Sequence, residues 1–123
     1  MAKVLTVFLW GLIFSLPVMQ VKDNFHVWFE RSGGFAGMTI KTEIDSKSTD
    51  PVEADSIRHL VNQSNFFEVQ ITDTLPAGLP DQFNYKIKVE SGNKSREIEL
   101  TDSTIPVDFH PLIRYLVQKA RSK

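Results

Sequence analysis

Strict alternation of apolar and polar side chains limits the folds open to this chain more than any other feature. In residues 83–89 every second side chain is apolar, and the alternation resumes over residues 96–101 after a turn at residues 91–94. Period two predicts strands with one apolar face, here joined as a hairpin. Residues 25–30 and 38–44 alternate in the same way and predict a first hairpin. Nine side chains are expected on the apolar face: Phe25, Val27, Phe29, Ile40, Phe83, Tyr85, Ile87, Ile98 and Leu100.

A helix is predicted between the two hairpins. Asp50 and Pro51 suit the cap and the first position of a helix, and Glu53 stands where a capping-box acid belongs. We expect this helix to run to about Ser64, with Asn65 ending it. Six apolar side chains are expected in the core, the last two beside the helix end: Val52, Ile57, Leu60, Val61, Phe66 and Phe67.

A last helix is predicted after the second hairpin. Its start is bracketed by Pro106 and Pro111, and proline suits the first turn of a helix but not its interior. Lysine and arginine near its end suit the negative end of the helix dipole. Its buried face is expected to comprise Leu112, Ile113, Leu116, Val117 and Ala120. Residues 72–82 hold two prolines and a glycine and predict a loop.

The predicted order of elements is ββαββα, which belongs to the α+β class. Strands with one apolar and one polar face favour an antiparallel sheet, because parallel sheets are covered by helices on both faces. We therefore expect a four-stranded antiparallel sheet with two helices packed on one face. A length of 123 residues allows one domain with a modest core. The chain has no cysteine, so its stability must come from that core alone.

The first 20 residues differ from the rest of the chain. Lys3 gives a short basic start, residues 4–16 are almost wholly apolar, and Pro17 ends the run. This layout predicts a signal peptide over residues 1–20 and a mature domain over residues 21–123, secreted or periplasmic and not in the membrane. The run is short for a membrane span, but residues 18–20 form a poor cleavage site. An uncleaved N-terminal anchor is therefore the main alternative.

Motifs for catalysis or metal binding are missing from the sequence. His26, His59 and His110 have no acid or second histidine at metal-ligand spacing, and the acids of residues 45–55 are explained by capping and solvation. There is no metalloprotease helix motif, nucleophile elbow, phosphate loop or dinucleotide fingerprint. The formal net charge of −1 gives no attraction to nucleic acid. We expect a protein that is not an enzyme and takes no cofactor or metal.

Residues 31–37 are not explained by folding alone. They connect the strands of the first hairpin and place three glycines around Phe35. A hairpin connection uses glycine for positive φ, but it needs no large aromatic residue. One interpretation is that Phe35 folds back to cap the core. The other is that a glycine-rich loop presents Phe35 to a partner, with little side-chain bulk around a single anchor.

The same segment resembles a motif of the emfourin family, which consists of protein inhibitors of thermolysin-like zinc metalloproteases such as protealysin. The similarity continues in the helix of residues 57–61 and the phenylalanine pair that follows it. It includes the strand of residues 81–89 and the proline-led helix of residues 111–116, and it covers roughly residues 25–119. The first motif is fairly specific, whereas the helix and strand pieces alone are weak.

The resemblance implies a reversible inhibitor that blocks the active-site cleft of a thermolysin-like metalloprotease with its glycine-rich hairpin loop. The residues expected to contact the protease are Arg31, Ser32, Gly33, Gly34, Phe35, Ala36 and Gly37. We expect a monomer whose partner is this protease and not nucleic acid. Two alternatives stay open, because fold does not fix function: a secreted non-catalytic module with a different protein ligand, and a small enzyme.

Protealysin-like enzymes and their inhibitors often lack an export signal, whereas this chain is predicted to have one. The resemblance therefore implies the class of the target enzyme but does not identify it. We expect the protein isolated from its natural source to begin near Val21, because signal peptidase acts at the end of the segment just described. Mass spectrometry of the native protein measures this. An intact chain that begins at Met1 in the soluble cytoplasm would contradict the prediction.

Overall fold

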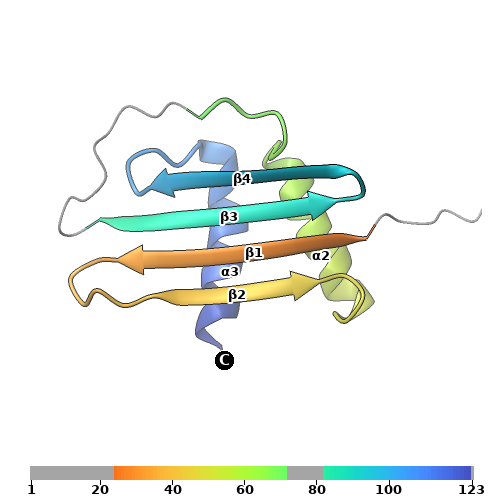
Figure 1. Ribbon diagram of the computed structural model, residues 1–123, viewed down its shortest axis with the longest axis horizontal. Helices are drawn as coiled ribbons and strands as arrows, with labels where there is room; N and C mark the ends of the chain where they lie inside the picture. The colour runs from red at the N-terminus through yellow and green to blue at the C-terminus, as the bar shows by residue number, and fades with distance from the viewer. Residues whose placement is uncertain (1–23, 72–81, 123) are drawn as a thin grey trace, which may run out of the picture.

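The computed structural model describes residues 24–71 and 82–122 of the chain (Figure 1). The predicted signal peptide lies outside the described residues, as does the predicted loop of residues 72–82 except for Gln82. The described elements, in chain order, are β1 (Phe25–Gly33), β2 (Ile40–Asp45), α2 (Pro51–Gln63), β3 (Phe83–Ser91), β4 (Lys94–Thr101), the short 3₁₀ turn η1 (Val107–Phe109) and α3 (His110–Arg121). This order confirms the predicted ββαββα arrangement.

The four strands form one antiparallel sheet in the order β2-β1-β3-β4. Each predicted hairpin is present, and the two are joined by β1 and β3, which pair along their whole length from Phe25 opposite Ser91 to Gly33 opposite Phe83. Both helices lie behind the sheet in Figure 1, and α3 runs across the strands. The predicted architecture, with two helices on one face of the sheet, is confirmed.

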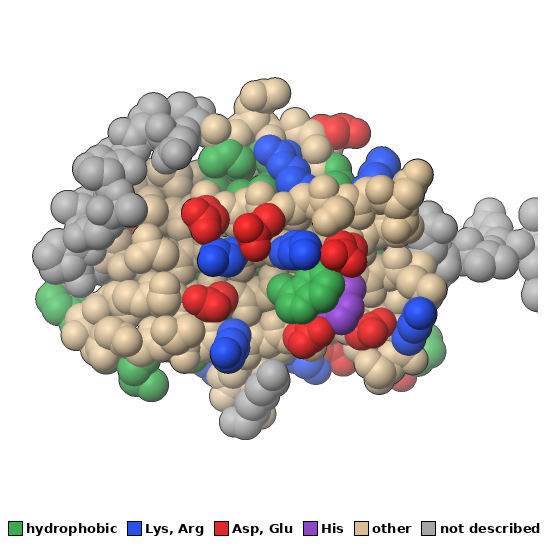
Figure 2. Space-filling view, in the orientation of Figure 1, with side chains coloured by type: hydrophobic (Ala, Val, Ile, Leu, Met, Phe, Trp, Pro, Cys, Tyr) green, Lys and Arg blue, Asp and Glu red, His purple; other side chains and the backbone are tan. Residues whose placement is uncertain are grey.

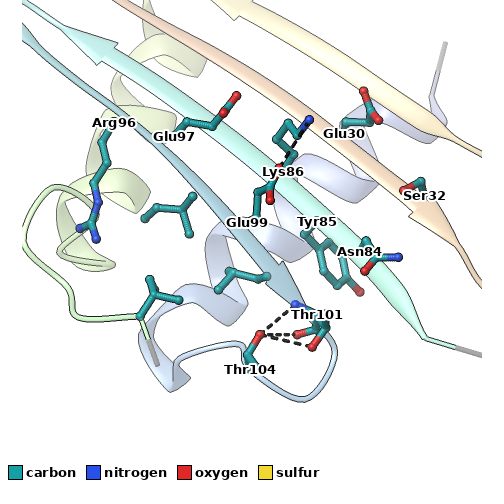
Figure 3. A pocket seen from close by; sticks show the side chains of 13 residues that line it. Glu30, Ser32, Asn84, Tyr85, Lys86, Arg96, Glu97, Glu99, Thr101 and Thr104 are labelled. Carbon is teal, nitrogen blue, oxygen red and sulfur yellow. Dashed lines mark hydrogen bonds and ion pairs between the residues drawn. The ribbon is translucent and has the colours of Figure 1, made fainter. Parts of the chain in front are cut away.

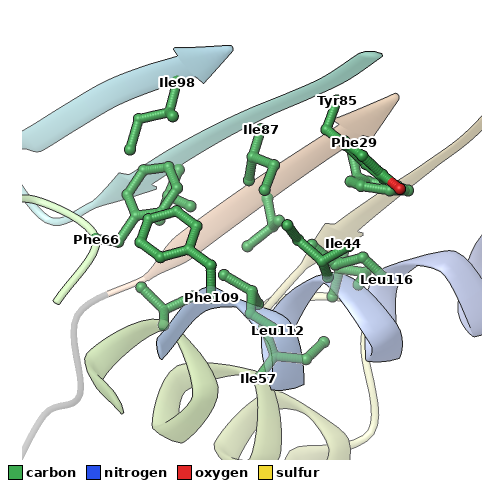
Figure 4. Packing of buried hydrophobic residues seen from close by; sticks show 14 of the residues in the cluster. Phe29, Ile44, Ile57, Phe66, Tyr85, Ile87, Ile98, Phe109, Leu112 and Leu116 are labelled. Atoms are coloured by element: carbon green, nitrogen blue, oxygen red, sulfur yellow. The ribbon is translucent and has the colours of Figure 1, made fainter. Parts of the chain in front are cut away.

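The core lies between the sheet and the helices (Figure 4). All nine side chains expected on the apolar face point into it: seven are buried, and Ile40 and Phe83 are half-buried against the same cluster. The predicted phenylalanine pair also reaches this cluster, and Phe66 stacks on Phe109 with ring centroids 5.8 Å apart. Fully burying a phenylalanine of this kind stabilises the fold by about 1.5–3 kcal/mol.

Helix α2 begins and ends as predicted. The Asp50 carboxylate accepts a hydrogen bond from the backbone N–H of Glu53 at 3.4 Å, and Asn65, just after the helix, has the left-handed φ of +56°. The expectation that Val52 belongs to the buried stripe is wrong, since its side chain is 73% exposed. The stripe is centred on Ile57, and five residues of helix place Val52 about 140° away from it around the axis.

The first hairpin is offset from its predicted bounds. Strand β1 continues to Gly33, whereas β2 begins only at Ile40, which pairs with Arg31. Met38, the first residue of the segment expected as the second strand, precedes β2 and is 66% exposed. The two strands of the hairpin end at different points because β1, after its last pair with β2, continues to Gly33 by pairing with β3 alone.

The outer face of the sheet is exposed and charged, with acidic and basic side chains interspersed (Figure 2). Trp28 lies on this face, where the His26 ring stacks on it at 3.7 Å and the Lys88 ammonium lies 5.0 Å from its ring centre. These neighbours cover part of an aromatic surface that would otherwise face water. In the described part of the chain, no helix is both long enough and apolar enough to span a membrane.

A polar contact ties the two helices together. The Glu53 carboxylate, in the first turn of α2, accepts a hydrogen bond from the Tyr115 hydroxyl at 2.8 Å and lies 2.5 Å from the Lys119 ammonium. The hydrogen bonds from Lys119 and, second, from Tyr115 lower the pKa of Glu53 below its usual 4.5. Burial, and then the bond to Glu53, raise the pKa of Tyr115 to about 12.

We predict that Glu53→Gln lowers the free energy of unfolding by about 1 kcal/mol near neutral pH, because it weakens both contacts. The pKa of Glu53 is lower in the folded than in the unfolded chain. Its contribution is therefore complete above pH 4.5 and is lost as the pH falls through the folded value. Urea denaturation at neutral and strongly acidic pH measures this. The exposed Glu68→Gln is the matched control, and an equal loss at both pH values would contradict the prediction.

Candidate functional site

The seven residues predicted to contact a protease lie at one end of the sheet, where β1 leaves it. Arg31, Ser32 and Gly33 are the last residues of β1, and Ser32 lies opposite Asn84 of β3. The next four residues, 34–37, form a turn outside the sheet. The structure thus divides the predicted segment into a half held in the sheet and a half that projects from it.

The projecting half is a β-turn bounded by glycines. The backbone N–H of Gly37 donates to the carbonyl oxygen of Gly34 at 3.2 Å, which leaves Phe35 and Ala36 at the two central positions. Gly34 and Gly37 have φ of +76° and +61°, values that other residues rarely adopt. The Phe35 side chain is 94% exposed, so the interpretation that it folds back to cap the core is wrong.

The loop is attached at the start of β3, one of the two central strands of the sheet, as well as to its own hairpin. The backbone N–H of Gly34 donates to the carbonyl oxygen of Gln82 at 3.1 Å, beside the pair that Gly33 makes with Phe83. The approach is close: a Cβ atom at Gly33 would lie 2.6 Å from the Gln82 carbonyl oxygen, and one at Gly34 would lie 2.7 Å from Cε1 of Phe83. Both glycines are therefore required by space as well as by backbone angle.

The attachment point on β3 is itself held by several contacts. The Asp102 carboxylate, in the turn after β4, accepts hydrogen bonds from the Phe83 backbone N–H and the Tyr85 hydroxyl, each at 2.8 Å. The Arg31 guanidinium lies over the Phe83 ring, 4.1 Å from its centre. Burial, and then the bond to Asp102, raise the pKa of Tyr85 to about 12. The Arg31 side chain thus packs on the ring of Phe83, the residue against which the base of the loop lies.

Sequence reasoning missed three residues of this site. Met38 extends the exposed apolar surface of the loop, and Gln82 and Asp102 hold its base. Alternation placed Met38 inside the sheet, which hid its exposure. No local signal marks the role of Asp102, because its partner N–H belongs to a strand 19 residues earlier in the chain.

Polar side chains elsewhere in the described residues form structural contacts. No group of three or more histidine, aspartate or glutamate side chains there lies close enough to hold a metal ion. A shallow depression beside β4 is lined mainly by polar residues (Figure 3), but several are engaged in structural contacts. Lys86 and Glu99 lie 3.6 Å apart as an ion pair, and the Thr101 backbone N–H donates to the Thr104 hydroxyl at 2.8 Å.

The fold and the exposed loop define a small α+β domain with a projecting apolar turn at one end of its sheet. The chain belongs to the emfourin family, whose model matches residues 29–117. The emfourin family consists of protease inhibitors, which are not catalysts, so the expectation that the chain is not an enzyme is confirmed.

A solved structure is similar over most of both chains. It is emfourin (M4in) from Serratia proteamaculans, described as an M4 family peptidase inhibitor. The two chains are 17% identical, the match covers 79% of this chain and 90% of that one, and the TM-score is 0.44. No curated protein matches the chain.

The two glycines that bound the turn allow a matched test of its packing. We predict that Gly37→Ala lowers the free energy of unfolding by about 1 kcal/mol, because a Cβ atom there meets only backbone strain. Gly34→Ala should cost clearly more, because the new methyl group also overlaps the Phe83 ring. Urea denaturation of both variants measures the difference. Equal losses would mean that Gly34 does not lie against Phe83.

Proposed function

We propose that this protein is a reversible inhibitor of a thermolysin-like zinc metalloprotease and that the loop of residues 32–37 enters the active-site cleft. Membership of the emfourin family supports the class of activity. The observation that carries the mechanism is the position of Phe35, which is 94% exposed at the tip of a turn bounded by glycines. A fully exposed aromatic side chain adds nothing to the core and is suited to anchor an interface.

The chemistry of the loop matches an apolar pocket. Thermolysin-like enzymes as a class have such a pocket beside the zinc ion, and it takes a bulky side chain of an extended substrate. Residues 32–40 contain no charged side chain, and Phe35 and Met38 are both largely exposed. Entry of this loop into a cleft therefore requires no ionised group to leave water, which is the most costly form of desolvation.

The glycines give the backbone access to a narrow cleft. Gly37 has open space around the position of a Cβ atom, and Gly34 and Gly37 flank Phe35 and Ala36 with almost no side-chain bulk. The backbone on either side of the anchor could then approach the metal, which polarises a carbonyl group for attack by water. In this proposal, Phe35 fills the pocket and the glycine backbone occupies the remaining width of the cleft.

Resistance to cleavage follows from the way in which the loop is held. The turn is closed by the hydrogen bond between Gly34 and Gly37, and its first residue is bonded to Gln82 of the neighbouring segment. A peptide bond held in a turn differs from the extended form that the protease cleaves. If the bond is cut, the sheet keeps the two ends close together and favours its resealing.

We also propose that the protein acts outside the cytoplasm, on the basis of the apolar segment near its N-terminus. Its target would then be an exported protease of the thermolysin-like class. The lack of cysteine does not contradict that location, because a domain of about a hundred residues can be stable without a disulfide.

We predict that Phe35→Ala weakens inhibition of a thermolysin-like protease by at least about thirtyfold, because truncating a buried aromatic anchor costs about 2 kcal/mol or more. The melting temperature should barely change, since the side chain has no part in the core. Inhibition constants and thermal unfolding of the purified domain measure both effects.

Val52→Ala is the matched control, because Val52 is also apolar and 73% exposed but lies at the start of α2. It should inhibit as the wild type does. If the wild-type domain inhibits no thermolysin-like protease, the proposed function is wrong and the alternative, a binding module with a different protein ligand, is favoured. If Phe35→Ala inhibits as well as the wild type, the contact surface lies elsewhere on the domain.

A further inference from the structure

The loop is supported unequally on its two sides. On the first side, Gly33 pairs with Phe83, Gly34 bonds to Gln82, and both glycines lie within contact distance of that segment. On the second side, β1 has no pair with β2 beyond Arg31 and Ile40, and the turn is closed by the hydrogen bond between Gly37 and Gly34. The conformation of the exposed tip therefore depends on how firmly Gly34 is held.

Phe83 is the residue on which this support converges. Its ring carbons Cδ1, Cε1 and Cζ form the surface against which Gly34 lies, at 2.7–3.4 Å from the position of a Cβ atom. Its ring carries the Arg31 guanidinium at 4.1 Å, and its backbone N–H is held by Asp102 at 2.8 Å. The side chain is only half-buried and packs at the margin of the core. It is thus less buried in the core than Tyr85 or Ile87, and its ring lies directly against Gly34 of the loop.

We propose that Phe83 is a positioning residue for inhibition, with Arg31 as its support: the pair fixes the Gly34 turn and thereby orients Phe35 before the protease binds. The inference rests on the proposed function, since it assigns the residues that prepare the loop for its target. Phe83 itself does not need to touch the protease. A loop that is already ordered loses less conformational entropy on binding, so it binds more tightly for the same contacts.

The test compares Phe83→Leu with Phe67→Leu. Phe67 is also a half-buried phenylalanine at the margin of the core, and the Lys94 ammonium lies 5.7 Å from its ring centre. It lies near the start of β4, at the end of the sheet opposite the loop, because Lys94 pairs with Ser91 whereas Gly33 pairs with Phe83. The two substitutions remove the same ring from similar surroundings, so a general loss of packing should affect both proteins equally.

Amide hydrogen exchange in the free domain reports on the loop without any protease. We expect Phe83→Leu to accelerate exchange of the Gly34 and Gly37 amides by about tenfold, while the amides at the centre of β1 and β3 keep their rates. Phe67→Leu should leave the two glycine amides unchanged. If Phe83→Leu leaves their exchange rates at the wild-type values, the proposal is overturned.

Inhibition of a thermolysin-like protease is the second measurement. Phe83→Leu should raise the inhibition constant by about tenfold in the wild-type background, and it should have almost no effect in the Phe35→Ala background, because it acts by orienting Phe35. Equal effects in both backgrounds, or faster exchange with unchanged inhibition, would also overturn the positioning role. If the wild-type domain inhibits no such protease, the proposed function is wrong. The exchange experiment then still decides whether Phe83 fixes the loop.

Discussion

The pairing of β1 with β3 is the interaction on which the rest of the structure depends. An isolated two-stranded hairpin is marginally stable in water, and this chain contains two of them, separated by a helix and a long connection. Antiparallel pairing from Phe25 to Gly33 joins them into one sheet. It also aligns the apolar side chains of both hairpins, with Val27 opposite Val89 and Phe29 opposite Ile87, so that one continuous face can be covered by the helices.

The same register determines the structure of the end of the sheet that carries the exposed loop. Because β1 stays paired with β3 after it has left β2, Gly33 meets Phe83 and the following turn is held against the central strand. The tip therefore projects from a rigid part of the sheet. The proposed mechanism relies on this combination of a fixed base and an exposed aromatic side chain, because an inhibiting loop must fit a cleft without adopting the extended form of a substrate.

The two faces of the sheet have different tasks. The inner face and the helices supply the stability that a chain without cysteine must obtain from its core. The outer face carries interspersed charges, and its Trp28 ring is partly covered by His26 and Lys88. The loop, by contrast, places uncharged and apolar residues at one end of the sheet, away from those charges.

Local features of the sequence determined the elements of this protein and their inward faces. Side-chain alternation, the Asp50 cap and the terminating Asn65 act within a few residues, so the chain order ββαββα and the core positions could be predicted. The tertiary structure alone decided the strand order, the extension of β1 to Gly33, and the exposure of Val52, Met38 and Phe35. The strand order and the extension of β1 depend on pairing between segments fifty or more residues apart, whereas the exposure of Val52 depends on which side of α2 packs on the sheet. An aromatic residue among glycines is free to turn inward or outward, and only the folded structure shows that Phe35 is exposed, at the tip of a turn whose base packs on Gln82 and Phe83.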